Sequence, residues 1–326
     1  MLSRKRIGLA LGSGGARGLA HIGVLKVLER EKIPIDLIVG CSMGSLIGGL
    51  YASGMSAYTL EEIALNISWK QTAKIFTPTI SKAGLVDGDR IEKLLETFIG
   101  KKGFSKLRIP FATVATDIEN GKEVIIKTGK VSRAIRASCS IPGIFTPLKY
   151  GKRYLVDGGL VDPVPVDVAR KHGADIVIGV NVIPEVNYKQ KDSSVVKFDI
   201  FKSKNERTLN KRKITSKIVN TRITKFIEEK INVTGIKQTL LKIFTEKKKK
   251  KEKHKMPSIF NILMQAIFIM EREIAEMKLK EADVGIEVEF KNPINPMQYY
   301  RSAECILEGE KAAEKVLPLI RKIISK

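Results

Sequence analysis

Short apolar runs that end in glycine alternate with segments whose apolar residues recur every three or four positions. The first run spans residues 7–11, and the helical pattern after it extends to Glu31. The second run spans 37–39 and is followed by a helical pattern over 46–51. Apolar runs bounded by glycine indicate buried strands, and recurrence every three or four residues indicates helices. The N-terminal part therefore predicts the order strand, helix, strand, helix.

The same alternation continues towards the C-terminus. The pattern predicts further strands at 111–115, 124–127, 176–182 and 284–290. It predicts further helices at 90–98, 132–138, 166–171, 257–274 and 303–324. Strands separated by helices indicate a sheet that is covered on both faces. The expected fold class is α/β, with a mainly parallel central sheet flanked by helices.

One long stretch interrupts this pattern. Residues 185–256 are polar and hold 22 Lys and Arg against 8 Asp and Glu, so most of the formal net charge of +23 is local. We interpret this stretch as a helical or flexible insertion in one domain formed by 1–184 and 257–326. A run of five lysines, 247–251, lies near its end.

The insertion also has an amphipathic pattern. Five apolar residues can share one face of a helix whose other positions are rich in Lys and Arg: Ile214, Ile218, Ile223, Phe226 and Ile231. Such a helix is typical of docking on an anionic membrane, where each lysine near the surface adds about 1 kcal/mol. A solvated flexible loop is the alternative. Few aromatic residues interleave the lysines, so no nucleic-acid partner is expected.

Composition restricts the chemistry. The chain of 326 residues is 43% hydrophobic and 29% charged, which is typical of a globular protein. Its three cysteines and three histidines lack metal-ligand or disulfide spacing, so we expect neither a metal site nor a disulfide framework. The sequence predicts no secretory signal and no transmembrane segment. We expect a cytoplasmic protein, located at the inner face of the membrane if the insertion docks there.

A candidate nucleophile follows the second predicted strand. Gly40-Cys41-Ser42-Met43-Gly44 matches the pattern G-x-S-x-G, and a helix is expected directly after it. In a nucleophile elbow of this kind the serine lies on a sharp turn, and the flanking glycines avoid a collision as the backbone reverses. A glycine-rich turn that carries an ordinary surface serine would give the same pattern.

A second glycine-rich segment follows the first predicted strand. It reads Gly12-Ser13-Gly14-Gly15-Ala16-Arg17-Gly18, and its amides should point from the same end of the sheet as Ser42. Free amides there could stabilise an oxyanion, an effect of about 10²–10³ in rate for each donor. A dinucleotide loop is the competing interpretation, but Arg17 occupies the position of the third glycine.

A reactive serine also needs a base. The candidate is Asp157 in Val156-Asp157-Gly158-Gly159, which ends a strand-like stretch and has two glycines that permit a close backbone approach. His172 comes late enough in the chain to act as an alternative base, but it lies at a predicted helix end, where histidines are usually solvated. An Asp-Gly turn without catalytic function would explain Asp157 equally well.

Taken together, the glycine segment with Arg17, the Gly40-x-Ser42-x-Gly44 turn and Asp157-Gly158-Gly159 resemble the patatin-like phospholipases, which are lipid acyl hydrolases with a Ser-Asp dyad. Residues 16–25 and 137–145 also resemble bacterial members. The resemblance covers residues 5–183 well and 257–315 more loosely. Ser13 is a departure, because many members have a glycine there. The stretch 185–256 is longer than the usual connection.

The resemblance implies that Ser42 is the nucleophile, that Asp157 is the base, and that the amides of Gly14 and Gly15 form the oxyanion hole. The motif residues that support this site are Gly12, Arg17, Gly18, Gly40, Gly44, Gly158 and Gly159. The expected activity is hydrolysis of carboxylic esters of lipids or phospholipids through an acyl-enzyme, without a cofactor. A noncatalytic module on the same fold, binding a membrane or a nucleotide, is the alternative.

Overall fold

A computed structural model describes residues 4–66, 87–184 and 259–325. All of these residues belong to one unit of the chain, formed from residues 1–187 and 258–326. The expected insertion at 185–256, with its amphipathic helix and lysine run, lies outside the described residues. Its role as a separate membrane-docking segment therefore stays a prediction.

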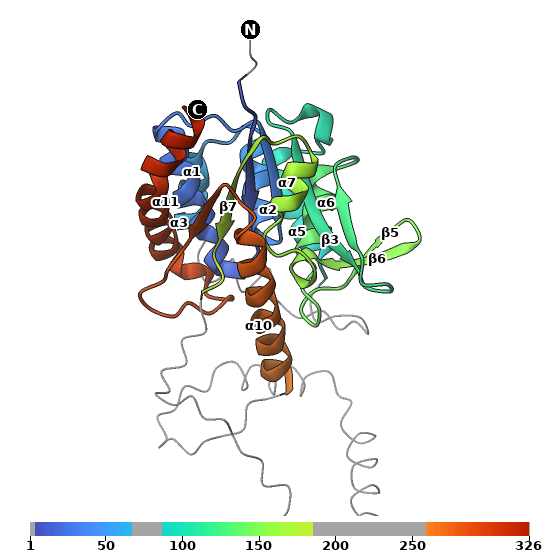
Figure 1. Ribbon diagram of the computed structural model, residues 1–326. Helices are drawn as coiled ribbons and strands as arrows, with labels where there is room; N and C mark the ends of the chain where they lie inside the picture. Colours follow the sequence, from blue (N-terminus) through green and yellow to red (C-terminus); the bar gives the residue numbers. More distant parts are fainter. Residues whose placement is uncertain (1–3, 67–86, 185–258, 326) are drawn as a thin grey trace, which may run out of the picture. The chain divides into compact units, whose positions relative to one another are not determined.

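A sheet of eight strands forms the centre of the described unit (Figure 1). Seven strands follow each other across the sheet in the order β5-β6-β3-β2-β1-β7-β8, and β4 pairs with β3. Their bounds are β1 Ile7–Leu11, β2 Leu37–Cys41, β3 Phe111–Asp117, β4 Glu123–Ile126, β5 Leu148–Tyr150, β6 Arg153–Asp157, β7 Ile176–Asn181 and β8 Val284–Glu287.

The central pairs of the sheet are parallel. Strand β1 lies between β2 and β7, β2 also pairs with β3, and β7 with β8, all in parallel. Strands β4, β5 and β6 add antiparallel pairs at one side. The expected mainly parallel sheet is confirmed. Because parallel strands end at the same edge, the segments that follow β1 and β2 meet there.

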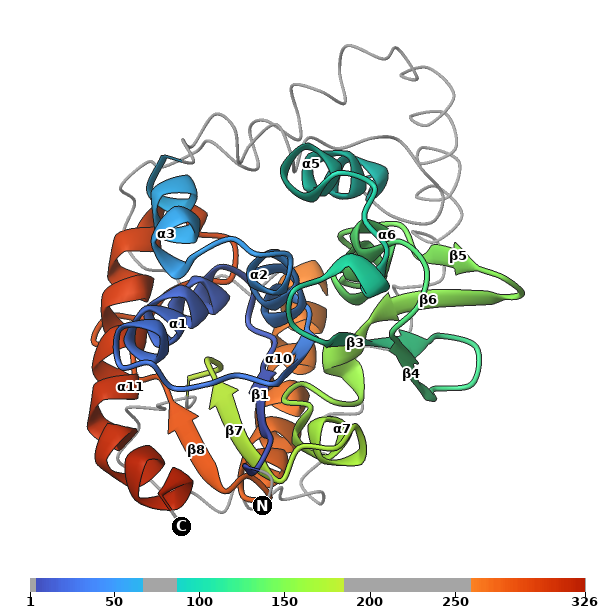
Figure 2. The same ribbon diagram turned by 90° about the horizontal axis from the view of Figure 1, so that it is seen from above.

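Helices cover both faces of this sheet (Figure 2). Their bounds are α1 Ala20–Arg30, α2 Met43–Ala52, α3 Ala57–Asn66, α5 Asp89–Ile99, α6 Val131–Ser138, α7 Val166–Lys171, α10 Ile259–Leu279 and α11 Ser302–Ile324. Helices α1 and α7 lie on opposite sides of β1. The first face packs against α1, α2, α3 and α11, and the second packs against α7 and the C-terminal half of α10.

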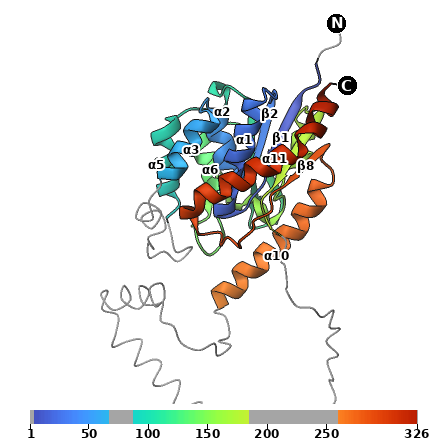
Figure 3. The same cartoon turned by 90° about the vertical axis from the view of Figure 1, so that its left-hand side faces the viewer.

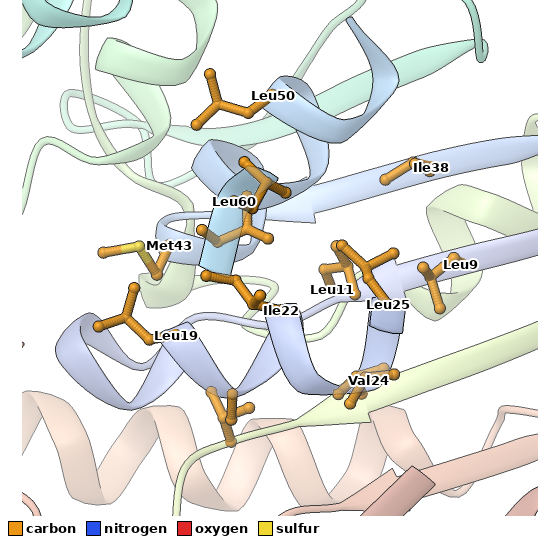
Figure 4. Close-up of a cluster of buried hydrophobic side chains, with 14 of the residues drawn as sticks. Leu9, Leu11, Leu19, Ile22, Val24, Leu25, Ile38, Met43, Leu50 and Leu60 are labelled. Atoms are coloured by element: carbon orange, nitrogen blue, oxygen red, sulfur yellow. The ribbon is translucent and has the colours of Figure 1, made fainter. Parts of the chain in front are cut away.

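The main core lies between β1, β2 and the helices of the first face. Figure 4 shows Leu9 and Leu11 of β1 beside Ile22 and Leu25 of α1. All four side chains are fully or almost fully buried. Full burial of a leucine or isoleucine contributes about 1.5–3 kcal/mol, so this cluster fixes the positions of the strand ends.

Two helices, α1 and α11, touch backbone to backbone. A Cβ atom on Gly23 would lie 2.0 Å from the carbonyl oxygen of Ile306, and one on Gly309 would lie 2.0 Å from that of Ala20. No side chain fits at either position. Helix α11 therefore packs directly against α1, close to the glycine segment that follows β1.

Helix α10 reaches beyond the sheet. Its C-terminal half packs on the second face through Ala275 and Leu279, and its N-terminal half extends past the strand ends (Figure 3). Within the described residues no helix combines the length and the apolar character that a membrane span requires.

Most predicted elements match the structure within a few residues, with two additions. Helix α3 and strand β5 were not predicted. Helix α3 buries only Ala57, Leu60 and Ala64, which is a weak apolar pattern. Strand β5 has three residues, of which Leu148 alone is buried, so its place depends on pairing with β6.

Replacing Gly309 by Ala should lower the free energy of unfolding by about 2 kcal/mol, because the new methyl group forces the backbones of α1 and α11 apart. Denaturant unfolding measures the change. The control is Leu307→Ala on the same helix, where the side chain is 48% exposed and the expected change is about 0.5 kcal/mol or less. Equal effects of the two variants would contradict the close helix contact.

Candidate active site

Ser42 lies on a strained turn between β2 and α2. It has φ 52° and ψ −119°, and Ser42 and Lys32 are the non-glycine residues with positive φ in the described part of the chain. Such a conformation costs about 1–3 kcal/mol and persists only where the surroundings enforce it. Ser42 also caps α2, so its hydroxyl lies at the positive end of the helix dipole.

The C-terminal end of α6 holds this turn in place. The Ser42 amide donates to the hydroxyl of Ser138 at 2.8 Å. The Ser42 carbonyl accepts from the Cys139 thiol at 3.2 Å and from the Leu46 amide at 3.1 Å. Neither Ser138 nor Cys139 was among the predicted site residues, although both lie in the segment 137–145 that carried the family resemblance.

Asp157, the last residue of β6, lies beside Ser42. The Ser42 hydroxyl donates to Asp157 Oδ2 at 2.6 Å, and the Gly159 amide donates to Oδ1 at 2.8 Å. The backbone of Asp157 is fixed as well, since its amide donates to Ser140 and its carbonyl accepts from Thr116. The structure thus brings together the two residues that are 115 positions apart in the sequence.

The glycine segment after β1 borders the same place. The amides of Gly12 and Ser13 donate to the carbonyls of Val180 and Pro163 at 3.0 and 2.8 Å. The chain then turns at Gly14, whose φ of 155° strongly favours glycine. Within the described residues the amides of Gly14 and Gly15 donate to no protein acceptor, so both are available to an oxyanion.

The remaining motif residues pack these segments together. A Cβ atom on Gly44 would lie 2.1 Å from the carbonyl oxygen of Leu11, so the first turn of α2 touches the end of β1. A Cβ atom would also lie within 2.8 Å of backbone atoms at Gly12, Gly40 and Gly158, and within 2.5 Å of side-chain atoms at Gly18 and Gly159. Arg17 donates from Nε to the Ile294 carbonyl at 2.7 Å and lies over the Phe268 ring at 5.6 Å.

The two described histidines have other partners. His172 Nδ1 lies 2.8 Å from the Val168 carbonyl in its own helix. His21 is fully buried and donates from Nε2 to the Gly12 carbonyl at 2.8 Å. Burial lowers the pKa of His21 to about 4, so this ring is neutral at physiological pH. His21 therefore supports the glycine segment, and neither ring contacts Ser42.

A small cavity of about 10 Å³ adjoins the Ser42–Asp157 pair, with room for about one water-sized group. Its lining residues are Ser13, Gly14, Gly15, Ser42, Ile141, Asp157, Ile267, Phe268 and Glu271. The last three belong to α10 and were not predicted for the site. A larger hollow of about 420 Å³ lies beside β4, β5 and β6 and shares no lining residue with this cavity.

Two buried carboxyl groups set the charge of the site. Burial raises the pKa of Asp157 to about 6, although the hydrogen bonds from Ser42 and Gly159 oppose this shift. Burial, with the nearby charge of Asp157, raises the pKa of Glu271 to about 8. At neutral pH Asp157 is therefore ionised and can accept the proton of the Ser42 hydroxyl, while Glu271 is neutral.

One group of acidic side chains elsewhere brings three ligand atoms within 4.8 Å of one another in the described part of the chain, namely those of Glu123, Asp162 and Asp167. Lys278 Nζ lies 2.7 Å from Asp167 and 3.8 Å from Asp162. The lysine thus supplies a cation to this group. The prediction that the protein needs no metal is not tested by this arrangement.

Comparison with known families gives a match over the N-terminal part of the chain. Residues 9–170 match the family described as Patatin-like phospholipase. This range includes Ser42, Asp157 and the whole glycine segment. It ends before α10, so Ile267, Phe268 and Glu271 lie outside it.

Curated relatives match slightly more than half of the chain. An uncharacterized NTE family protein of Mycobacterium tuberculosis is 38% identical over 183 residues, 55% of this chain and 50% of the relative. Lysophospholipase NTE1 of Debaryomyces hansenii is 35% identical over 188 residues, 56% of this chain and 12% of the relative. The chain thus spans half or less of these relatives. Among solved structures, VipD from Legionella pneumophila has a TM-score of 0.43 and 13% identity, covering 97% of this chain and 67% of that chain.

Replacing Asp157 by Asn should stabilise the protein at pH 8, by about 1–3 kcal/mol. The pKa of the carboxyl is higher in the folded state, at about 6, than its ordinary value of 3.8. Its contribution to stability is therefore present below about pH 4 and lost as the pH rises through 6. Asparagine avoids the buried charge, and its oxygen can accept from the Gly159 amide while its NH2 group donates to the Ser42 hydroxyl.

Urea unfolding of both proteins at pH 8 and at pH 4 measures this effect. We expect the variant to be more stable at pH 8 and the two proteins to be nearly equal at pH 4. A variant that is less stable than the wild type at pH 8 would contradict the buried, destabilised carboxylate.

Proposed function

Through residues 9–170 the chain belongs to the patatin-like phospholipase family, and we propose that it is a serine hydrolase that cleaves carboxylic esters of lipids through a Ser42–Asp157 dyad. The observation that carries the proposal is the 2.6 Å hydrogen bond from Ser42 to Asp157, next to the free amides of Gly14 and Gly15. The names of two relatives, lysophospholipase and patatin-like phospholipase domain-containing protein, support a lipid substrate.

The reaction begins with proton transfer from Ser42 to Asp157. The Ser42 oxygen attacks the ester carbonyl carbon, and the carbonyl oxygen becomes an oxyanion that accepts from the Gly14 and Gly15 amides. When the tetrahedral intermediate collapses, the C–O bond to the alcohol breaks. Asp157 returns its proton to the departing oxygen, which leaves acyl-Ser42.

Water then releases the acid in a second step. Asp157 accepts a proton from the water, whose oxygen attacks the acyl-Ser42 carbonyl carbon. The bond to Ser42 breaks, the Ser42 oxygen regains the proton, and a carboxylic acid leaves. A base with a pKa near 6 suits this role better than an exposed aspartate, because it is ionised at neutral pH and binds a proton more strongly.

We also propose that the enzyme docks on an anionic membrane surface at the inner face of the membrane, through residues 185–256. The described residues next to this stretch support docking. Residues 259–270 of α10 carry no charged side chain, and Ile259, Leu263 and Met270 are 72%, 56% and 55% exposed. Apolar side chains that follow a lysine-rich stretch in the sequence suit a surface with both anionic head groups and acyl chains.

Replacing Ser42 by Ala should abolish ester hydrolysis and labelling by a fluorophosphonate, because the variant lacks the attacking oxygen. Mass spectrometry of the labelled wild type locates the modified residue. Ser53→Ala is the matched control, since Ser53 is a buried serine just after the other end of α2. We expect it to react like the wild type.

The same assay separates a dyad from a triad. His172→Ala should keep at least a third of the wild-type rate, because His172 contacts its own helix. Retained hydrolysis in Ser42→Ala would refute the proposed nucleophile. A thousandfold loss in His172→Ala would show that the base was assigned wrongly. An unlabelled wild type without activity would favour a noncatalytic module.

Vesicle sedimentation tests the docking, with Ser42→Ala as the background so that the lipid stays intact. Leu263→Glu, and separately the change of Lys247–Lys251 to Gln, should each weaken binding to phosphatidylserine-containing vesicles at least tenfold. Met277→Glu, in the charged half of α10 and 60% exposed, is the matched control. Unchanged binding in the first two variants would refute docking through this region.

A further inference from the structure

A second carboxyl group reaches the proposed catalytic cavity from α10. Glu271 is 6% exposed, and its Oε2 atom is hydrogen-bonded to the hydroxyl of Ser13 at 3.1 Å. Ser13 precedes Gly14, so the bond connects α10 to the segment with the free amides. Glu271 lies outside residues 9–170, and its partner Ser13 is the position at which this chain departs from the family pattern.

Glu271 is packed closely against Gly159, the residue whose amide binds the other carboxyl group of the site. A Cβ atom on Gly159 would lie 2.5 Å from Glu271 Oε1 and 3.1 Å from the Ser13 hydroxyl. The Gly159 amide donates to Asp157 at 2.8 Å. Ser13, Gly159 and Glu271 therefore form one contact layer around Asp157 and the turn at Gly14.

No cation neutralises Glu271 directly within the described residues. The positive charge of Arg17 acts on Glu271, but the Arg17 Nε donates to the Ile294 carbonyl and its guanidinium lies over Phe268. The other titratable groups that face Glu271 are Asp157 and Cys41. Burial raises the pKa of the Cys41 thiol well above its ordinary value, so that group is neutral.

Two carboxyl groups in one buried cavity cannot both ionise without a large electrostatic cost. Asp157 carries the first charge, with a pKa of about 6, and Glu271 loses its proton only at about 8. Between these values the cavity holds one negative charge, on the residue proposed as base. Above about pH 8, the ionised Glu271 places a second negative charge beside the position where the oxyanion develops.

We propose that Glu271 is a positioning residue: its neutral carboxyl group holds the glycine segment through Ser13, and its ionisation switches the site off. The inference rests on the proposed function. It follows from the geometry because the oxyanion at Gly14 and Gly15 would form next to Ser13, where a charged Glu271 would repel it. The neutral form gives the same hydrogen bond without this repulsion.

The test is the pH dependence of kcat/KM for a water-soluble ester between pH 5 and 10. The wild type should give a bell-shaped profile that rises near pH 6 and falls near pH 8. Glu271→Gln should keep the rate at pH 7 within about threefold and lose the falling limb, so that at pH 9.5 it exceeds the wild type at least tenfold. Glu271→Ala should be slower at pH 7, because Ser13 loses its partner.

Asp162→Asn is the matched control, since burial also raises the pKa of Asp162 to about 8 but its carboxyl group lies beside Lys278 and outside the cavity. This variant should keep the falling limb. A falling limb that persists unchanged in Glu271→Gln would overturn the proposal. A Gln variant as slow as the Ala variant at pH 7 would also overturn it.

A wild type without hydrolysis at any pH would refute the proposed function, and the ionisation of Glu271 would still be measurable. Thermal unfolding of Glu271→Gln and of the wild type then tests whether Glu271 is protonated in the folded protein. A folded pKa above the ordinary value means that the wild type loses stability as the pH rises through 8. The Tm of Glu271→Gln minus the Tm of the wild type should therefore increase from pH 6 to pH 9. A difference that stays constant over this range would refute the proposal that Glu271 is a buried neutral acid.

Discussion

The hydrogen bond from Ser42 to Asp157 requires two separate chain reversals to meet where both side chains are buried. One reversal leaves β2 with a strained serine, and the other leaves β6 through a glycine pair. Each is fixed by its own backbone contacts, through Ser138 for Ser42 and through Ser140 and Thr116 for Asp157. The surrounding helices, strands and glycines thus hold the strained backbone of Ser42 next to the buried carboxylate of Asp157, and both features lower the stability of the fold.

The fold could be predicted largely from the sequence because its signals are local. The runs that became β1 and β2 are buried on both faces, so they read as continuous apolar segments bounded by glycine. Helix α3 and strand β5 lack such signals, since few of their residues are buried. Their positions depend on neighbours that are distant in sequence, which no local pattern encodes.

In the candidate site, too, residues with a local sequence signal could be predicted and residues placed only by long-range contacts could not. The turns at Ser42, in the glycine segment and at Asp157 have recognisable glycine spacing, and the family resemblance implied the role of each. Glu271 lies 258 residues from its partner Ser13, so only the folded chain reveals the contact. One signal was available: Glu271 is the first charged residue after the uncharged residues 259–270, although it lies within the helical apolar pattern.

The close contact between α1 and α11 has a consequence for biosynthesis. By the time residue 184 has been translated, β1, β2, β3, β6 and β7 have been made, together with both turns of the proposed dyad. The face of α1 that receives Ile306 and Gly309 stays uncovered until residues 302–324 leave the ribosome. The nascent chain thus exposes this face of α1 until α11 has been made, and transiently exposed apolar surface of this kind favours aggregation.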